Sequence, residues 1–113
     1  MAAVPMLRRR TDFEAIGRHG TARSTPILVL RSLRSDRHET RVGLSTPRTL
    51  GGAVERNRVR RRLRGLVQQR LGRIGGGWDL LLIARPASRQ ATYAELGAAL
   101  DALLERSEIT RDR

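Results

Sequence analysis

Residues 53–64 read AVERNRVRRRLR, and the rest of the chain is organised around this stretch. Positions 56–64 hold six arginines and one asparagine, and Glu55 is the only acid in the stretch. At about 100° per residue on a helix, the apolar residues from position 59 onward fall on one stripe: Val59, Leu63, Leu66, Val67, Leu71 and Ile74. The stretch therefore predicts a helix that buries one face and presents arginine on the other.

The polar residues of this helix divide into two flanks. One flank holds Asn57, Arg60, Arg61 and Arg64, and the other holds Arg58 and Arg62. Like charges four positions apart on a helix repel by a few tenths of a kcal/mol per pair. A solvated helix face normally mixes charges of both signs, so a face that keeps so many arginines indicates a polyanionic partner.

Composition supports the same interpretation. The chain has 113 residues and a formal net charge of +12, and all 23 of its basic residues are arginine. This charge favours nucleic acid as the partner, with an anionic membrane surface as the alternative. Arginine grips phosphate bidentately and stacks on bases. Hydrophobic residues make up 39%, so we expect one domain over 1–113 with a modest core and flexible ends at 1–6 and 107–113.

Several classes of protein are excluded. The chain has no cysteine, so it has no disulfide framework and no thiolate metal site. Its longest apolar run, Leu80 to Ala84, is too short to span a bilayer. Met1 to Arg10 lacks the apolar stretch of a signal peptide. We therefore expect a cytoplasmic protein without a membrane partner, with Met6 as an alternative start to Met1.

The first part of the chain predicts one helix and two long strands. Residues 11–14 have the pattern of a capping box, so we expect a short helix from about position 12 to 18, ended by Gly20. Its apolar side is Phe13 and Ile16. Residues 26–33 and 40–45 then predict two strands. The polar turn between them predicts a hairpin, and alternation in the second strand predicts that one of its faces is wet.

The second part of the chain predicts the arginine helix to about Gly72, a strand over 79–85 and a last helix over about 93–106. The strand is apolar without interruption over five residues, which is typical of a central strand covered on both faces. Thr92 to Glu95 repeats the capping-box pattern before the last helix. Its buried stripe is expected to be Leu96, Leu100, Leu103 and Leu104.

A further short strand at 21–24 completes the expected order, α-β-β-β-α-β-α. The fold class is α+β, with three helices packed on a small mixed four-stranded sheet.

No catalytic or metal-binding set stands out in the sequence. His19 and His38 are isolated, whereas a general base needs a partner and a pocket. The eleven carboxylates are scattered, and residues 75–77 lack the lysine and the following helix of a phosphate-binding loop. No helix-turn-helix or zipper pattern flanks the basic helix, which favours structured RNA over DNA without excluding DNA.

Residues 51–64 resemble the signature of the bacterial ribonuclease P protein subunit, an Ala-Val-x-Arg-Asn-Arg stretch that continues into a basic helix. Other segments agree in the same order, from the helix between Asp12 and Gly20 to Tyr93 at the start of the last helix. Between them lie 41–45 before the loop and the strand 79–84. The resemblance covers roughly residues 7–106.

The resemblance implies the accessory subunit of a ribozyme that removes the 5′ leader of precursor tRNA by endonucleolytic hydrolysis. The RNA subunit would hold the catalytic centre, with Mg²⁺ bound mainly by that RNA and the substrate. The implied partners are ribonuclease P RNA and the precursor-tRNA leader, and no protein oligomer is expected. The implied fold is ribosomal S5 domain 2-like, with a left-handed β-α-β crossover through the arginine helix, although such crossovers are right-handed in about 98% of cases.

The resemblance also implies roles for individual residues. The RNA-binding set would be Arg48, Arg56, Asn57, Arg58, Arg60, Arg61 and Arg64. Phe13 and Arg31 would line the leader cleft, with no catalytic and no metal-binding residue in the protein. The chain departs from the family at Gly17 and Arg31, where aromatics are common, and at Arg48-Thr49, which follows Pro47 and replaces a lysine pair. Base stacking, worth about 1–3 kcal/mol per base, is thereby reduced, and Arg31 would substitute by a cation–π or phosphate contact.

Two other hypotheses stay open on the residues alone. One is a generic basic ribosome- or DNA-binding protein. The other is a self-sufficient nuclease that uses His19 or His38.

Overall fold

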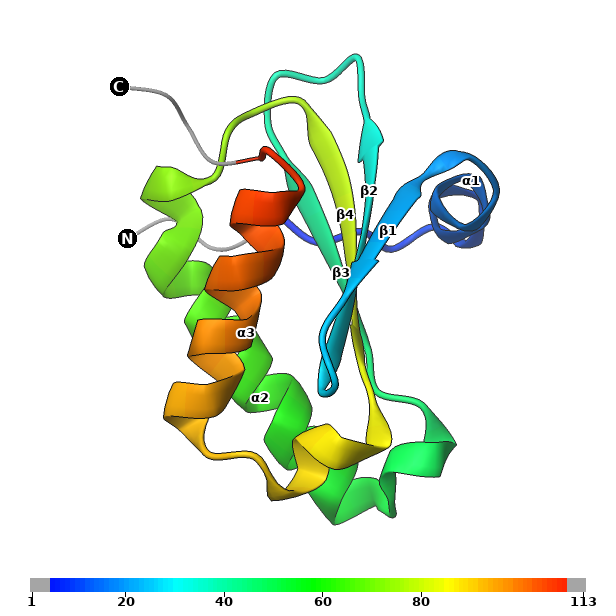
Figure 1. Ribbon diagram of the computed structural model, residues 1–113. Helices are drawn as coiled ribbons and strands as arrows, with labels where there is room; N and C mark the ends of the chain where they lie inside the picture. Colours follow the sequence, from blue (N-terminus) through cyan, green and yellow to red (C-terminus); the bar gives the residue numbers. More distant parts are fainter. Residues whose placement is uncertain (1–4, 110–113) are drawn as a thin grey trace.

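A four-stranded mixed sheet carries helices on both faces in the computed structural model, which describes residues 5–109 (Figure 1). The helices are α1 (Arg10–His19), α2 (Ala53–Arg70) and α3 (Tyr93–Arg106). The strands are β1 (Thr21–Ser24), β2 (Leu28–Arg34), β3 (Arg41–Ser45) and β4 (Trp78–Ala84). Three short 3₁₀ helices join them: η1 (Arg48–Leu50), η2 (Leu71–Arg73) and η3 (Pro86–Gln90). The predicted element order is confirmed, including the short strand at 21–24.

Strand β4 lies inside the sheet, whose order is β1-β2-β4-β3. It pairs antiparallel with β2 and parallel with β3. Its side chains Leu80, Leu82 and Ala84 are at most 2% exposed. The prediction of a central strand at this position is confirmed, because a strand with apolar residues on both faces is covered only inside a sheet.

The predicted hairpin between β2 and β3 is wrong, because β4 lies between them. The turn after β2 instead crosses the amino end of β4. Thr40 holds this crossing: its hydroxyl donates to the Gly75 carbonyl at 2.6 Å and accepts from the Trp78 amide at 3.2 Å. A Cβ on Gly76 would lie 2.4 Å from the His38 carbonyl oxygen, so the crossing also needs a bare backbone there.

Helices α2 and α3 pack on one face of the sheet and α1 lies on the other (Figure 1). The predicted stripe of α2 is confirmed, since Val59, Leu63, Leu66 and Val67 are at most 3% exposed. The leucine stripe of α3 is confirmed as well, with all four side chains at most 2% exposed. These two stripes and the inner face of the sheet form the core.

The two predicted capping boxes have opposite outcomes. The one before α3 is confirmed: the Thr92 hydroxyl accepts from the Glu95 amide at 3.0 Å, and the Thr92 amide donates to Glu95 Oε1 at 2.8 Å. The one at residues 11–14 is wrong, because α1 begins at Arg10 and its N-cap, Arg9, makes no side-chain hydrogen bond. Thr11 therefore lies inside the first turn, where its hydroxyl cannot cap the helix.

The end of helix α1 at Gly20 also has a different cause from the one expected. Its φ of −75° is open to any residue. A Cβ there, however, would lie 2.5 Å from the Ile16 carbonyl oxygen and 3.1 Å from that of Ser32. Glycine is thus required because α1 approaches β2 closely at this point.

The wet face predicted for β3 is wrong, because α1 covers it. Gly43 is buried, and a Cβ there would lie 2.6 Å from Phe13 Cε1. The expectation of flexible ends at 1–6 and 107–113 stays a prediction. Met6 forms a parallel bridge with Val42, and Ile109 is 1% exposed. Residues 1–4 and 110–113 lie outside the described residues, so the choice between a start at Met1 and the alternative start at Met6 stays a prediction.

The unit β3-α2-β4 joins two parallel neighbouring strands through a helix. This is the unit for which a left-handed crossover was expected, and its hand stays a prediction. Within residues 5–109, no helix is long and apolar enough to cross a membrane.

An ion pair fixes α2 against α3. Arg70 donates from Nε and Nη2 to the two carboxylate oxygens of Asp101, at 2.6 and 3.2 Å, and Arg73 adds a third bond at 3.1 Å. The hydrogen bonds from Arg70 lower the pKa of the Asp101 carboxyl. The buried stripe holds α2 against the sheet, and this ion pair fixes the orientation of α2 relative to α3.

We expect Leu63→Ala to lower the free energy of unfolding by about 2–5 kcal/mol, because it opens a cavity at a fully buried position of α2. Urea unfolding followed by circular dichroism measures this loss. Arg64→Ala, at the neighbouring exposed position, is the matched control and should stay within about 0.5 kcal/mol of the wild type. Equal stability of the two variants would contradict the assignment of the buried stripe.

Candidate nucleic-acid interface

The outer face of α2 exposes Asn57, Arg61 and Arg64. The predicted basic surface is therefore present on the side away from the sheet. Within the described residues, the guanidinium groups of Arg61, Arg64 and Arg48 make no hydrogen bond and no ion pair. Each keeps five N–H donors for an external acceptor such as phosphate.

Arg56 and Arg60 are held in place by Thr46, at the carboxyl end of β3. Arg56 Nε donates to the Thr46 carbonyl at 2.8 Å, and Arg60 Nη2 donates to the Thr46 hydroxyl. Arg60 Nη1 also donates to Asn57 Oδ1 at 3.1 Å. Both arginines are half-buried. One or two of their donors serve as anchors, so the remaining donors point outward from fixed positions.

Thr46 was missed by sequence reasoning. It is 3% exposed and is one of only five polar or charged residues buried in the described part of the chain. Its position directly after a strand and before Pro47 is the signal in the sequence that marks it. Nothing in the helix pattern alone, however, brings residue 46 next to residues 56 and 60.

Arg58 lies on the opposite flank of α2, as the helical spacing predicts. Its Nη2 donates to the Arg89 carbonyl at 3.2 Å, and Arg62 Nη1 donates to the Ala91 carbonyl at 3.4 Å. Arg58 Nε is buried and has no partner within residues 5–109. Arg58 therefore does not join Arg56, Asn57 and Arg60, the members of the predicted RNA-binding set that are connected to Thr46.

The single acid of the motif has a structural role. Glu55 Oε1 accepts from the Gly52 amide at 3.1 Å and so caps the amino end of α2. Gly51, with φ of 149°, adopts a conformation that glycine alone takes readily. Arg48 is exposed on η1 just before this turn. The carboxylate thus stabilises the helix and does not pair with the exposed arginines.

The proposed leader residues lie between α1 and the outer face of the sheet. Phe13 packs over Gly43 and is half-buried. Arg31 reaches from β2 to the carboxyl end of α1, where Nη2 donates to the Gly17 carbonyl at 2.9 Å and Nε to the Ile16 carbonyl at 3.4 Å. A cation at this end of a helix is favoured by the helix dipole. A Cβ on Gly17 would meet nothing within 4 Å, so the position of the missing aromatic is open space.

An ion-pair cluster ties α1 to the sheet at the same face. Arg41 donates from Nε and Nη2 to both oxygens of Asp79, at 3.0 and 2.8 Å, and from Nη1 to Asp12 Oδ2 at 3.4 Å. The hydrogen bonds with Asp79 raise the pKa of the Arg41 guanidinium. Asp79 is 7% exposed, so Arg41 supplies the hydrogen bonds that its buried carboxylate needs.

Histidines and carboxylates do not converge anywhere in the described residues. His19 and His38 are both exposed, and they belong to different segments, α1 and the β2–β3 turn. No group of three or more histidine and acidic side chains within residues 5–109 could hold a metal ion.

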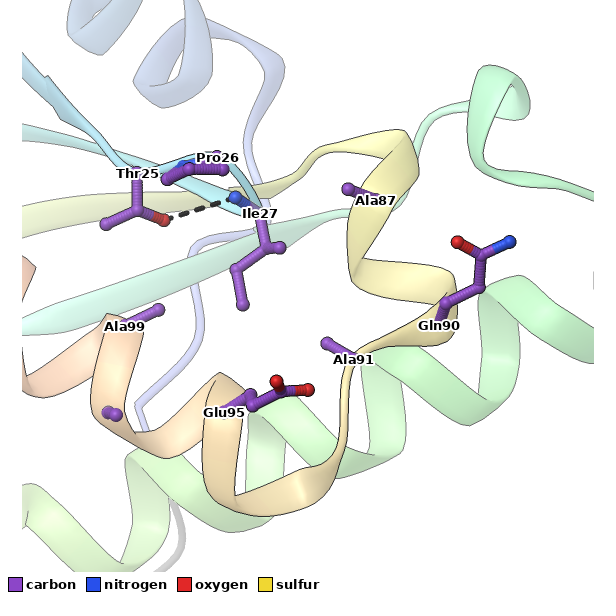
Figure 2. Close-up of a pocket in the computed structure, with 9 residues that line it drawn as sticks. Thr25, Pro26, Ile27, Ala87, Gln90, Ala91, Glu95 and Ala99 are labelled. Atoms are coloured by element: carbon purple, nitrogen blue, oxygen red, sulfur yellow. Dashed lines mark hydrogen bonds between the residues drawn. The ribbon is translucent and has the colours of Figure 1, made fainter.

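Figure 2 shows a cavity whose lining includes none of the arginines of α2. It has a volume of about 480 Å³ and lies between the turn before β2, η3 and the first turns of α3. Its floor is Ile27 with several alanines, and Glu95 is the only charged side chain in its lining. An apolar cavity with one acid at its edge does not suit a polyanion.

Comparison with known proteins identifies the fold and the family. The family model described as Ribonuclease P matches residues 1–108. The ribonuclease P protein component of Acidothermus cellulolyticus is 40% identical over 108 residues, which cover 94% of this chain and 90% of that protein. The RNase P protein of Thermotoga maritima has a TM-score of 0.82 at 26% identity, covering 89% and 96% of the two chains. That of Staphylococcus aureus has the same fold, with a TM-score of 0.87 at 22% identity and coverage of 94% and 97%.

We expect Arg41→Met to lower the free energy of unfolding by roughly 3 kcal/mol, because it leaves the buried Asp79 carboxylate without a partner. Urea unfolding at pH 7 measures the change. Arg10→Met removes the surface pair with Glu14, in which Arg10 is 91% exposed, and should change stability by less than about 1 kcal/mol. The double variant Arg41→Met/Asp79→Leu should be more stable than Arg41→Met alone. If the single variant matched the wild type, the cluster would not hold α1.

Proposed function

The chain belongs to the ribonuclease P protein family, and from this premise we propose how it serves that ribonuclease. As a family member it is the accessory protein of ribonuclease P in tRNA processing, with ribonuclease P RNA as its partner. We propose that α2 binds this RNA through phosphate contacts. We further propose that the space between α1 and the sheet binds the precursor-tRNA leader, and that the RNA performs the hydrolysis. This assembly would act in the cytoplasm.

The observation that carries the proposal is that some arginines of α2 are exposed and others are anchored. Arg61 and Arg64 are exposed and have no hydrogen-bond or ion-pair partner within residues 5–109, whereas Arg56 and Arg60 are anchored by Thr46. Exposed guanidiniums supply charge, and anchored ones supply a fixed geometry with less conformational entropy to lose on binding. A rigid, positively charged helix face is suited to an RNA surface whose phosphates are themselves held by tertiary structure.

Leader binding is proposed from the geometry at α1. The ring of Phe13 is partly exposed at this face, and Arg31 donates two hydrogen bonds to carbonyls of α1. Its remaining donors could meet a phosphate of a single strand lying along the sheet. Because Gly17 leaves open space where the family commonly has an aromatic, the leader would be held more by phosphate contacts than by stacking.

Mg²⁺ is proposed to be bound mainly by the RNA and the substrate. The acids closest to the two surfaces are already engaged: Glu55 caps α2, and Asp12 and Asp79 pair with Arg41. A hard cation prefers several oxygen ligands together, and the arginines around these acids repel it. The protein would therefore contribute positioning, and neither a general base nor a metal ligand.

Reconstitution tests the proposal. The protein is mixed with precursor tRNA alone and with precursor tRNA plus a ribonuclease P RNA at limiting Mg²⁺. We expect no cleavage by the protein alone and a clear stimulation of cleavage when the RNA is present. Cleavage by the protein alone would instead support a self-sufficient nuclease, and RNA binding without stimulation would support a generic basic binder.

We expect neutralising Arg60 and Arg61 together, as Arg60→Gln/Arg61→Gln, to weaken binding to ribonuclease P RNA and to flatten its salt dependence. Each lost phosphate contact should lower the slope of log K against log salt by about 0.7–0.9. Filter-binding titrations at several salt concentrations measure the slope. Arg37→Gln, in the turn before β3 at the end of that strand opposite to Thr46, is the control and should leave the slope unchanged. An unchanged slope in the double variant would refute phosphate binding by α2.

A further inference from the structure

Two large hydrophobic side chains are exposed in the described part of the chain, Val54 at 78% and Tyr93 at 41%. Tyr93 is the first residue of α3, directly after the N-cap Thr92. Nothing in the core requires an aromatic there, because the buried stripe of α3 begins at Leu96. Tyr93 is also the only tyrosine of a chain that has just three aromatic residues.

The ring of Tyr93 lies against α2 at a place where that helix has no side chain. A Cβ on Gly65 would be 3.5 Å from the Tyr93 hydroxyl oxygen. The amino end of α3 lies beside the middle of α2 (Figure 1). The hydroxyl end of the ring therefore contacts bare helix surface, and about two fifths of the residue stays accessible to a ligand.

Two arginines of α2 lie on the same flank. Arg62 donates to the carbonyl of Ala91, two residues before Tyr93, and Arg58 donates to the carbonyl of Arg89. Each guanidinium thereby uses one of its Nη groups and is oriented along the segment that leads into α3. The other Nη of each remains a donor for an external acceptor.

No carboxylate neutralises these arginines among the described residues. The acids near this flank both cap helices: Glu55 accepts from the Gly52 amide, and Glu95 accepts from the Thr92 amide. Neither Arg58 nor Arg62 takes part in an ion pair within residues 5–109. An exposed aromatic ring beside two uncompensated guanidiniums has the components of a site for single-stranded nucleic acid, in which bases stack and phosphates pair.

We propose that Arg58, Arg62 and Tyr93 form a second RNA contact, the tyrosine flank, on the side of α2 that faces α3. An unpaired nucleobase stacks on Tyr93, and the phosphates of the same strand meet Arg62 and Arg58, which are one helical turn apart. The base is unpaired because a base inside a duplex offers no free face to an aromatic side chain. The inference rests on the proposed function, since it assumes that α2 is the helix that meets RNA.

The matched variants Tyr93→Phe and Tyr93→Leu test stacking. Phenylalanine keeps the ring, whereas leucine keeps an apolar side chain and loses the ring. We expect Tyr93→Leu to weaken binding between about 5-fold and about 150-fold, with Tyr93→Phe within about 2-fold of the wild type. The salt slope should stay that of the wild type in Tyr93→Leu, and should fall by about 0.7–0.9 in Arg62→Gln.

Two arms of the same experiment separate the possible sources of the base. In one arm the full-length protein binds ribonuclease P RNA alone, and in the other the assembled ribonucleoprotein binds precursor tRNA. Weaker binding by Tyr93→Leu in the first arm assigns the stacked base to the RNA subunit. Weaker binding by this variant only in the second arm assigns the base to the substrate. Urea unfolding of each variant checks that the fold is intact.

Equal binding by Tyr93→Leu and Tyr93→Phe in both arms would overturn the tyrosine flank. The variant Arg60→Gln/Arg61→Gln is titrated in parallel. If it weakens binding while the two Tyr93 variants bind equally, only the further inference fails. If it also binds like the wild type, the proposed role of α2 fails.

Discussion

The rest of the structure depends on the need to cover β4 on both faces. Its apolar residues allow no edge position, so β4 separates β2 from β3, although those two strands follow one another in the chain. The chain must then leave β3, cross one face of the sheet and return beside it in parallel, which only a long connection can do. That connection is α2. The same constraint that completes the core thus places the arginine helix across the sheet with its charged face outward.

Burial of the α2 stripe decides where the charges lie, but anchoring decides what they can do. A solvated arginine is a mobile charge with much rotamer entropy to lose on binding. Here backbone and hydroxyl acceptors at Thr46, Arg89 and Ala91 fix four of the arginines. These acceptors come from the segments that follow β3 and β4, so the fold of the sheet ends defines the geometry of the basic surface. The sheet therefore determines both where the arginines of α2 lie and how rigidly four of them are held.

Most local features were predictable from the sequence, the capping box at residues 11–14 being an exception, and the long-range pairings were not. The α2 and α3 stripes, the Thr92 cap and the central position of 79–85 each follow from neighbouring residues. The prediction of a hairpin failed because β3 and β4 compete for the place beside β2, and β4 takes it at the centre of the sheet. Thr46 was missed for a related reason, because its contacts are with residues ten or more positions away and no periodicity encodes them. Tyr93 was predicted only to start the last helix, and the RNA contact proposed for it depends in the same way on distant residues. The signal for Tyr93 was an aromatic at the first position of a helix, outside its apolar stripe.

Helix α1 is held differently from α2 and α3. Ile16 is its only fully buried side chain, and Phe13 packs half-buried over Gly43. Its other attachments are polar, through Arg41 with Asp12 and through Arg31 with the last carbonyls. Elements with little buried apolar area open at lower free-energy cost than the core. Ion pairs and carbonyl caps also allow small shifts at less cost than interdigitated leucines, because packed cores resist deformation. A helix held in this way can adjust its distance from the sheet, which would suit the proposed binding of leaders of different sequence.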